Sequence, residues 1–90
     1  MITMFIRHQV SDYAKWRQAY DAFADVQKRL GVRAEAVYQA ANFPNDVTVT
    51  HNFDNLAAAQ AFLASPELRG TMDNAGVASE PSIWFAEERA

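Results

Sequence analysis

A repeating apolar pattern over residues 13–30 is the feature that most constrains the fold of this 90-residue chain. Five apolar side chains recur there at alternating spacings of three and four: Trp16, Ala19, Phe23, Val26 and Leu30. This spacing predicts one amphipathic helix, which Asp12 would cap at its start and Gly31 would end in a left-handed conformation. A single amphipathic helix cannot bury its apolar stripe alone, so the pattern also predicts a sheet beneath it.

Four other segments have the β-branched and aromatic character of strands: residues 2–10, 32–39, 47–53 and 82–87. Pro44 and Asn45 suit the centre of a turn between the second and third of these strands, which predicts an antiparallel hairpin. A second helix is expected over residues 55–64, and Pro66 would then start a third, shorter helix that ends at Gly76.

The order is therefore β-α-β-β-α-β, the split βαβ pattern of the ferredoxin-like α+β fold. We expect a single domain over residues 1–90, with a four-stranded antiparallel sheet and the helices on one face. Strands 2–10 and 47–53 would be central. Alternation assigns one set of residues to the face under the helices: Met4, Ile6, Val47, Val49 and Phe53.

The opposite sheet face is predicted to carry a mixture of apolar and polar side chains: Phe5, Arg7, Gln9, Thr48, Thr50, Asn52 and Trp84. It is too apolar for a simple solvated surface and too polar for an ordinary interface core. Such a lining suits a partly enclosed pocket. Two such sheets, facing each other, would enclose a pocket between them.

Composition excludes several classes of function. The net charge of −3, with no cluster of Lys and Arg, argues against a nucleic-acid partner. The chain has no cysteine, so it has no disulfide and no thiolate ligand or nucleophile. It has no glycine-rich phosphate loop, no apolar run long enough to span a membrane and no basic-then-apolar leader. We therefore expect a cytoplasmic protein without a membrane partner.

Six segments carry a likeness to a known family: HQVSDYAKW (8–16), PNDV (44–47), FDNLAAAQAF (53–62), SPELR (65–69), AGV (75–77) and PSIWF (81–85). Across nearly its whole length the chain resembles the dimeric α/β-barrel proteins related to antibiotic-biosynthesis monooxygenases, among them small bacterial proteins labelled as cyclases. The resemblance implies two ferredoxin-like subunits with facing sheets and a pocket in each. Family activities range from cofactor-independent oxygenation of phenolic polyketides to cyclisation, haem breakdown and lactone isomerisation, so no single reaction follows from the fold.

His8 is the leading candidate for a catalytic group, because histidine titrates near neutral pH. It is either a core histidine bonded to Asp12, Tyr13 or a backbone carbonyl, or an acid/base at the mouth of a pocket. His51 has the same parity and could lie near it on the same sheet face. No carboxylate is spaced to complete a metal site with them, so we expect no metal.

Arg7 and Trp84 are candidates on the opposite face. Arg7 either polarises an oxygen of the substrate or forms a salt bridge with Glu35. Trp84 either stacks on an aromatic ligand or packs in a dimer interface. Asn52 is a candidate because the resembled oxygenases hold their substrates with asparagine, tryptophan and tyrosine side chains.

Tyr13 and Tyr20, which repeat with Gln27 every seven residues along the shoulder of the first helix, point either toward a ligand or toward water. Two functions fit these features. One is a homodimer that binds a small apolar or aromatic oxygenated molecule, with His8 in a cyclase- or monooxygenase-like reaction that needs no cofactor. The alternative is a non-catalytic ligand-binding or interaction dimer. A haem protein is a weaker third reading, because no predicted helix carries a histidine ligand.

Overall fold

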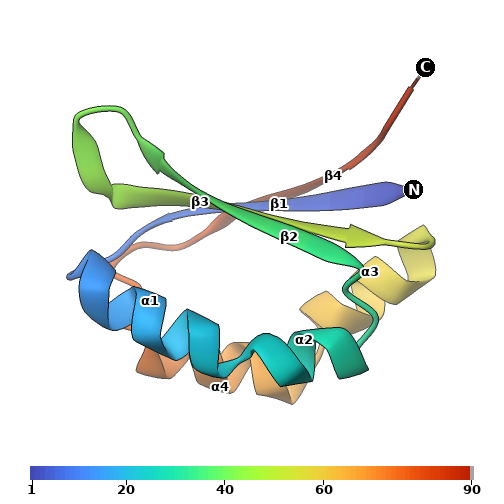
Figure 1. Ribbon diagram of the computed structural model, residues 1–90, viewed down its shortest axis with the longest axis horizontal. Coiled ribbons are helices and arrows are strands. Elements are labelled where there is room, and N and C mark those ends of the chain that lie inside the picture. The colour runs from blue at the N-terminus through green and yellow to red at the C-terminus, as the bar shows by residue number, and fades with distance from the viewer. Residues whose placement is uncertain (90) are drawn as a thin grey trace.

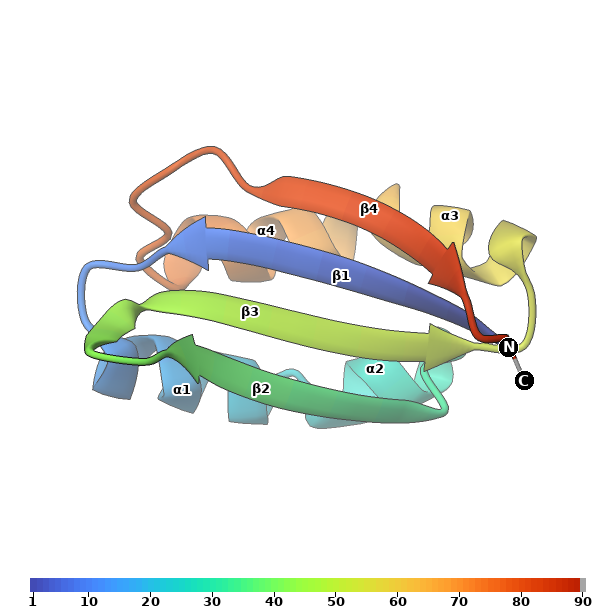
Figure 2. The ribbon, with the colours of Figure 1, turned by 90° about the horizontal axis from the view of Figure 1, so that it is seen from above.

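The computed structural model describes residues 1–89 as a four-stranded antiparallel sheet whose helices all lie against one face (Figure 1). The elements follow in chain order: β1 (Ile2–Gln9), α1 (Tyr13–Ala22), α2 (Ala24–Arg29), β2 (Ala34–Ala40), β3 (Phe43–Phe53), α3 (Leu56–Leu63), α4 (Pro66–Asn74) and β4 (Ser82–Glu87). The strand order is β2-β3-β1-β4, as Figure 2 shows from above. The predicted ferredoxin-like fold and the central places of β1 and β3 are confirmed.

The predicted helix-facing residues form the core of the sheet. Each is at most 3% exposed: Met4, Ile6, Val47, Val49 and Phe53. They alternate along β1 and β3, so parity alone assigned them correctly. Phe62 and Phe23 pack in one cluster with Met4, Ile6 and Phe53, whereas Val47 and Val49 pack in a second cluster with Trp16 and Tyr20.

The helical pattern over residues 13–30 is divided at Phe23, which corrects the prediction of one continuous helix. The amide of Phe23 donates to the carbonyl of Tyr20, three residues back, at 3.0 Å. This tighter turn separates α1 from α2. It also coincides with a rotation of the buried face, since Tyr20 and Gln27 are buried whereas Val26 is only partly so. Gly31 ends the region with a positive φ of 99°, as predicted.

The predicted turn at Pro44 and Asn45 is wrong, because both residues belong to β3. The chain reverses earlier, where Asn42 has a positive φ of 67°. Asn45 instead ties β3 to the junction of β1 and α1. Its backbone oxygen accepts from the amide of Val10 at 2.8 Å, and its side chain accepts from the amide of Tyr13 at 3.2 Å.

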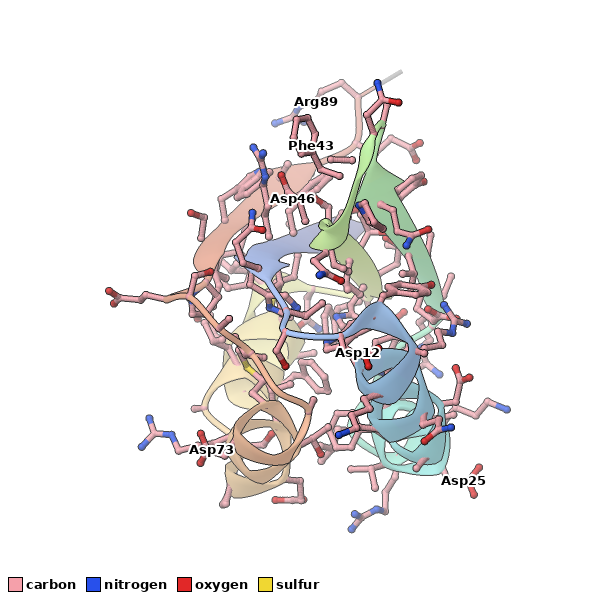
Figure 3. The ribbon with its side chains drawn as sticks, turned by 90° about the vertical axis from the view of Figure 1, so that its left-hand side faces the viewer. Asp12, Asp25, Phe43, Asp46, Asp73 and Arg89 are labelled. Atoms are coloured by element: carbon pink, nitrogen blue, oxygen red, sulfur yellow. The ribbon has the colours of Figure 1, made fainter. Side chains whose placement is uncertain are left out.

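The helices form two columns under the sheet, α1 with α2 and α3 with α4, as the view along the strands shows (Figure 3). Side chains cap each column. Asp12 accepts from the amides of Ala14 and Lys15, and Ser65 accepts from the amide of Leu68 with Pro66 at the first turn of α4. None of the helices within residues 1–89 has the length and apolar character needed to cross a bilayer.

The other sheet face carries no helix in the described chain (Figure 1). On it the rings of Phe5 and Trp84 stack in parallel, with centroids 5.1 Å apart. Trp84 is 45% exposed and Tyr38 is 57% exposed. Phe43, at the start of β3, is also exposed and projects away from the helices (Figure 3). We call this surface the open face.

Candidate functional site

A small cavity lies between the sheet and the helices, where α1, α2 and α4 meet the underside of β1 and β3. Its volume is about 30 Å³. Its lining is mostly apolar or aromatic: Ile6, His8, Trp16, Tyr20, Phe23, Gln27, Val49, His51, Leu68, Thr71, Met72 and Ala75. A space of this size holds a water molecule if polar groups are available to bind it.

His8 reaches this cavity from the end of β1 and is 5% exposed. Within residues 1–89 neither of its ring nitrogens has a hydrogen-bond partner, and its imidazole makes a T-shaped contact with Trp16, with ring centroids 5.9 Å apart. The predicted bond to Asp12, Tyr13 or a carbonyl is therefore absent. Burial lowers the pKa of His8, although the negative charge of Asp46 partly opposes that shift. His8 is thus a neutral, unpaired base at neutral pH.

His51, on β3, belongs to a hydrogen-bonded chain that runs from the buried interior to the exposed Glu35. The Tyr20 hydroxyl donates to Glu35 Oε2 at 2.6 Å and lies 3.2 Å from His51 Nε2. The other ring nitrogen, Nδ1, has no partner among the residues that the structure describes. Burial lowers the pKa of His51 to about 4, partly offset by the charge of Glu35. Burial and the bond to Glu35 raise the pKa of Tyr20.

Two residues of this site were not among the predicted ones. Gln27 is 4% exposed, lines the cavity, and leaves its Nε2 without a partner. Glu35 binds Tyr20, whereas the sequence paired it with Arg7. The seven-residue repeat of Tyr13, Tyr20 and Gln27 contained the signal for Gln27, because side chains seven apart share one side of a helix.

Arg7 forms its salt bridge with Asp46, not with the predicted Glu35. Arg7 Nε and Nη2 donate to the two Asp46 oxygens at 3.0 and 2.7 Å. Because Arg7 faces Thr48 across the strands, Asp46 is its diagonal neighbour on the open face. Glu35 faces His51 and therefore lies on the helix side.

The structure divides the seven predicted site residues between different places. His8, Tyr20 and His51 line the cavity. Arg7, Asn52 and Trp84 alternate with the buried residues and lie on the open face, where Asn52 accepts a hydrogen bond from Thr3 at 2.9 Å. Tyr13 packs against Trp16 with ring centroids 5.8 Å apart and does not line the cavity.

The two histidines are not direct cross-strand partners. His8 faces Val47 and His51 faces Met4, so three residue pairs separate them along the ladder, of which one, Ile6 with Val49, lies on the same sheet face. Within residues 1–89 no three His, Cys, Asp or Glu side chains gather closely enough to hold a metal ion. What the cavity offers is a set of neutral hydrogen-bonding groups in apolar surroundings, suited to binding a small oxygenated molecule and moving a proton.

No protein-family model matches the sequence, and no curated protein sequence is significantly similar to it. The similarity lies in solved structures. A Bordetella bronchiseptica protein assigned by name to the antibiotic biosynthesis monooxygenases superposes with a TM-score of 0.86 at 13% identity, over 99% of this chain and 97% of that one. A Deinococcus radiodurans protein of the same designation gives 0.79 at 21% identity, over 100% and 94%.

SnoaB, a cofactor-independent oxygenase from Streptomyces nogalater, superposes with a TM-score of 0.83 at 15% identity, over 99% of this chain and 93% of that one. At such low identities the likeness concerns the backbone arrangement and does not transfer an activity. In its strand order, its helices on one face and its overall backbone path, this chain has the ferredoxin-like fold of the antibiotic biosynthesis monooxygenase structures.

Proposed function

We propose that the protein is a homodimer that binds a small apolar or aromatic oxygenated molecule in the cavity beneath its sheet. One observation carries this proposal: both nitrogens of His8 and Nδ1 of His51 are buried without partners beside an otherwise largely apolar cavity. Leaving a buried polar atom unpaired costs about 1–3 kcal/mol, so such atoms are rare unless water or a ligand binds them.

The cavity volume of about 30 Å³ matches a bound water and not an aromatic ring. A ligand would therefore displace water and widen the space. The side chain best placed to yield is Met72 of α4, since it is unbranched and only partly buried. An opening of α4 away from the sheet would expose His8 and His51 to an incoming molecule.

In the catalytic form of the proposal, His8 is the acid/base, with Tyr20 and His51 in contact with the substrate. A neutral imidazole can accept a proton from a carbon or oxygen acid without first losing one itself. The lowered pKa of His8 keeps it in that form near neutral pH. No metal or organic cofactor enters this scheme, and SnoaB, with the same fold, is named as a cofactor-independent oxygenase.

The second part of the proposal is that the open faces of two copies pack together. This face presents the Phe5–Trp84 stack together with exposed Tyr38 and Phe43. A chain of 90 residues buries a limited fraction of its own surface, so it gains stability by covering such a patch. In this dimer Arg7, Asn52 and Trp84 would lie at or near the interface, and from there they could reach only a ligand bound between the sheets.

Replacing Trp84 with glutamate is expected to convert the dimer to a monomer at micromolar concentration. The change removes half of the aromatic stack and would bury a charge in the interface. Sedimentation velocity measures the result. Leu56→Glu is the matched control, because Leu56 is also exposed, at 43%, but lies on α3. A wild-type monomer, or equal behaviour of the two variants, would contradict the dimer.

The ligand site is tested by a thermal-shift screen of small aromatic and oxygenated compounds. A compound present at 100 times its Kd stabilises the native state by about 2.7 kcal/mol, which in a chain of this size raises Tm by roughly 10 °C or more. We expect His8→Ala to abolish that shift. Gln9→Ala, from the adjacent position on the other side of β1, should retain it. An equal shift in His8→Ala would place the ligand elsewhere.

A non-catalytic ligand-binding or interaction dimer is the second candidate, and the unpartnered histidine nitrogens beside the cavity support it equally. It differs from the first in a single respect, namely turnover. A compound found in the screen should be converted by the wild type and not by His8→Ala if the protein is an enzyme. Recovery of the compound unchanged after prolonged incubation with the wild type would favour the binding protein.

A further inference from the structure

The hydrogen-bonded residues Glu35, Tyr20 and His51 lie between two spaces of the molecule. On the inner side is the cavity that His51 lines. On the outer side is a groove of about 140 Å³, lined by residues of α1, α2 and the start of β2: Tyr20, Asp21, Ala24, Gln27, Lys28, Val32, Arg33, Ala34 and Glu35. Of the described residues, only Tyr20 and Gln27 line both spaces, so they form the wall between them.

The hydrogen bonds among Glu35, Tyr20 and His51 determine where their protons lie. The Tyr20 hydroxyl donates to Glu35 Oε2 at 2.6 Å, and this bond uses the single hydroxyl proton of Tyr20. The Tyr20 oxygen can then only accept from His51, at 3.2 Å. His51 must therefore carry its proton on Nε2. Its Nδ1 is left with a free lone pair and no partner.

We infer that Glu35, Tyr20 and His51 form a proton relay that connects the cavity beneath the sheet to the solvent in the outer groove. His51 Nδ1 accepts a proton from a group in the cavity. In the same event Nε2 gives its proton to the Tyr20 oxygen, and Tyr20 passes its own proton to the Glu35 carboxylate. His51 and Tyr20 both end neutral, and Glu35, which is exposed, releases the proton to water. As a deepening of the proposed function, this inference rests on it for the source of the cavity proton.

The surroundings of Glu35, Tyr20 and His51 favour a concerted proton transfer over one with a charged intermediate. His51 is 1% exposed and makes a T-shaped contact with Phe62, with ring centroids 5.2 Å apart. An imidazolium there would therefore be poorly solvated. His8 on β1, Gln27 on α2 and Thr71 on α4 are further polar residues that line the same cavity. Arg17 lies over the Tyr20 ring from α1, with its guanidinium carbon 5.6 Å from the centroid.

The relay is testable without a ligand, by NMR of the protein labelled with ¹⁵N-histidine. Long-range ¹H–¹⁵N correlations at pH 7 should show His51 with a proton on Nε2 and none on Nδ1. The exchange of that Nε2 proton with water should be about tenfold or more slower in Glu35→Gln, since its general base is removed. Gln can still accept from Tyr20, so this variant preserves the packing.

Asp21→Asn is the control, because Asp21 lines the same groove but has no contact with Tyr20 in the hydrogen-bonded chain. It should exchange like the wild type. Tyr20→Phe removes the acceptor and should shift His51 away from the Nε2 tautomer. A wild-type Nδ1 tautomer would overturn the relay, and so would an unchanged exchange rate in Glu35→Gln. A failed ligand screen would contradict the proposed function but would leave these NMR results unaffected.

Discussion

Lowering the pH from 7 to 4 is expected to reduce the free energy of unfolding by about 3 kcal/mol, because the folded protein resists protonation of His51. The pKa of His51 falls from 6.5 to about 4 on folding. Below pH 6.5 the unfolded chain binds a proton that the native state does not, so stability is lost as the pH falls from 6.5 toward 4. The lowered pKa of His8 acts in the same direction and adds to the loss.

Urea denaturation at a series of pH values and one protein concentration measures this dependence. His8 and His51 are the only two histidines in the chain, so the region between pH 6.5 and 5 isolates them from the carboxylates. Asp46 and Asp54 have pKa values lowered by their arginine partners, so their effects appear at lower pH. His51→Gln should flatten much of the profile. A wild-type stability that is constant from pH 7 to 5 would contradict the prediction.

Replacing Phe62 with alanine is expected to cost about 3–5 kcal/mol, the largest effect of a single substitution considered for this chain. Phe62 is 1% exposed, and its ring lies 5.4 Å from Phe53, 6.2 Å from Phe23 and 5.2 Å from His51. Truncation would leave a cavity among these rings. Small domains are stable by about 5–15 kcal/mol, so a large share of the variant could unfold at room temperature.

Leu56→Ala provides the comparison on the same helix. Leu56 is 43% exposed, so its removal should change stability by less than about 1 kcal/mol. The midpoint and slope of urea denaturation, followed by circular dichroism, distinguish the two variants. A cost for Phe62→Ala similar to that for Leu56→Ala would show that the α3 column is not packed as described. An unfolded Phe62→Ala variant beside a folded Leu56→Ala variant would agree with it.

Periodicity predicted most of the fold, because alternation along β1 and β3 depends only on which side chains must avoid water. The break at Phe23 could not be read in this way. No glycine or proline marks the break. It depends on the amide of Phe23, which bonds to the carbonyl of Tyr20, three residues back, where an α-helix would use the carbonyl four residues back. The hairpin failed for a different reason. Turn propensity favoured Pro44 and Asn45, but the contacts of Asn45 with Val10 and Tyr13 hold that segment in β3.

The candidate site was predictable as far as strand parity extends. Parity put His8 and His51 on one sheet face, and both line the cavity. Partner choice across strands needed the register, which composition does not contain. Charge alone made Glu35 a reasonable partner for Arg7, but the register puts Glu35 opposite His51 on the other side of the sheet. The substrate-binding role of Arg7, Asn52 and Trp84 stays a prediction. It depends on whether a ligand binds between the open faces of two copies.

The two tryptophans occupy opposite sides of one thin sheet. Trp16 is 3% exposed beneath it, stacked on Tyr20 and close to His8, whereas Trp84 is 45% exposed above it. The fluorescence of each tryptophan therefore reports on a different part of the molecule. Replacing Trp84 with phenylalanine would leave an emission that follows the interior around the histidines, and replacing Trp16 would leave one that follows the burial of the open face on assembly.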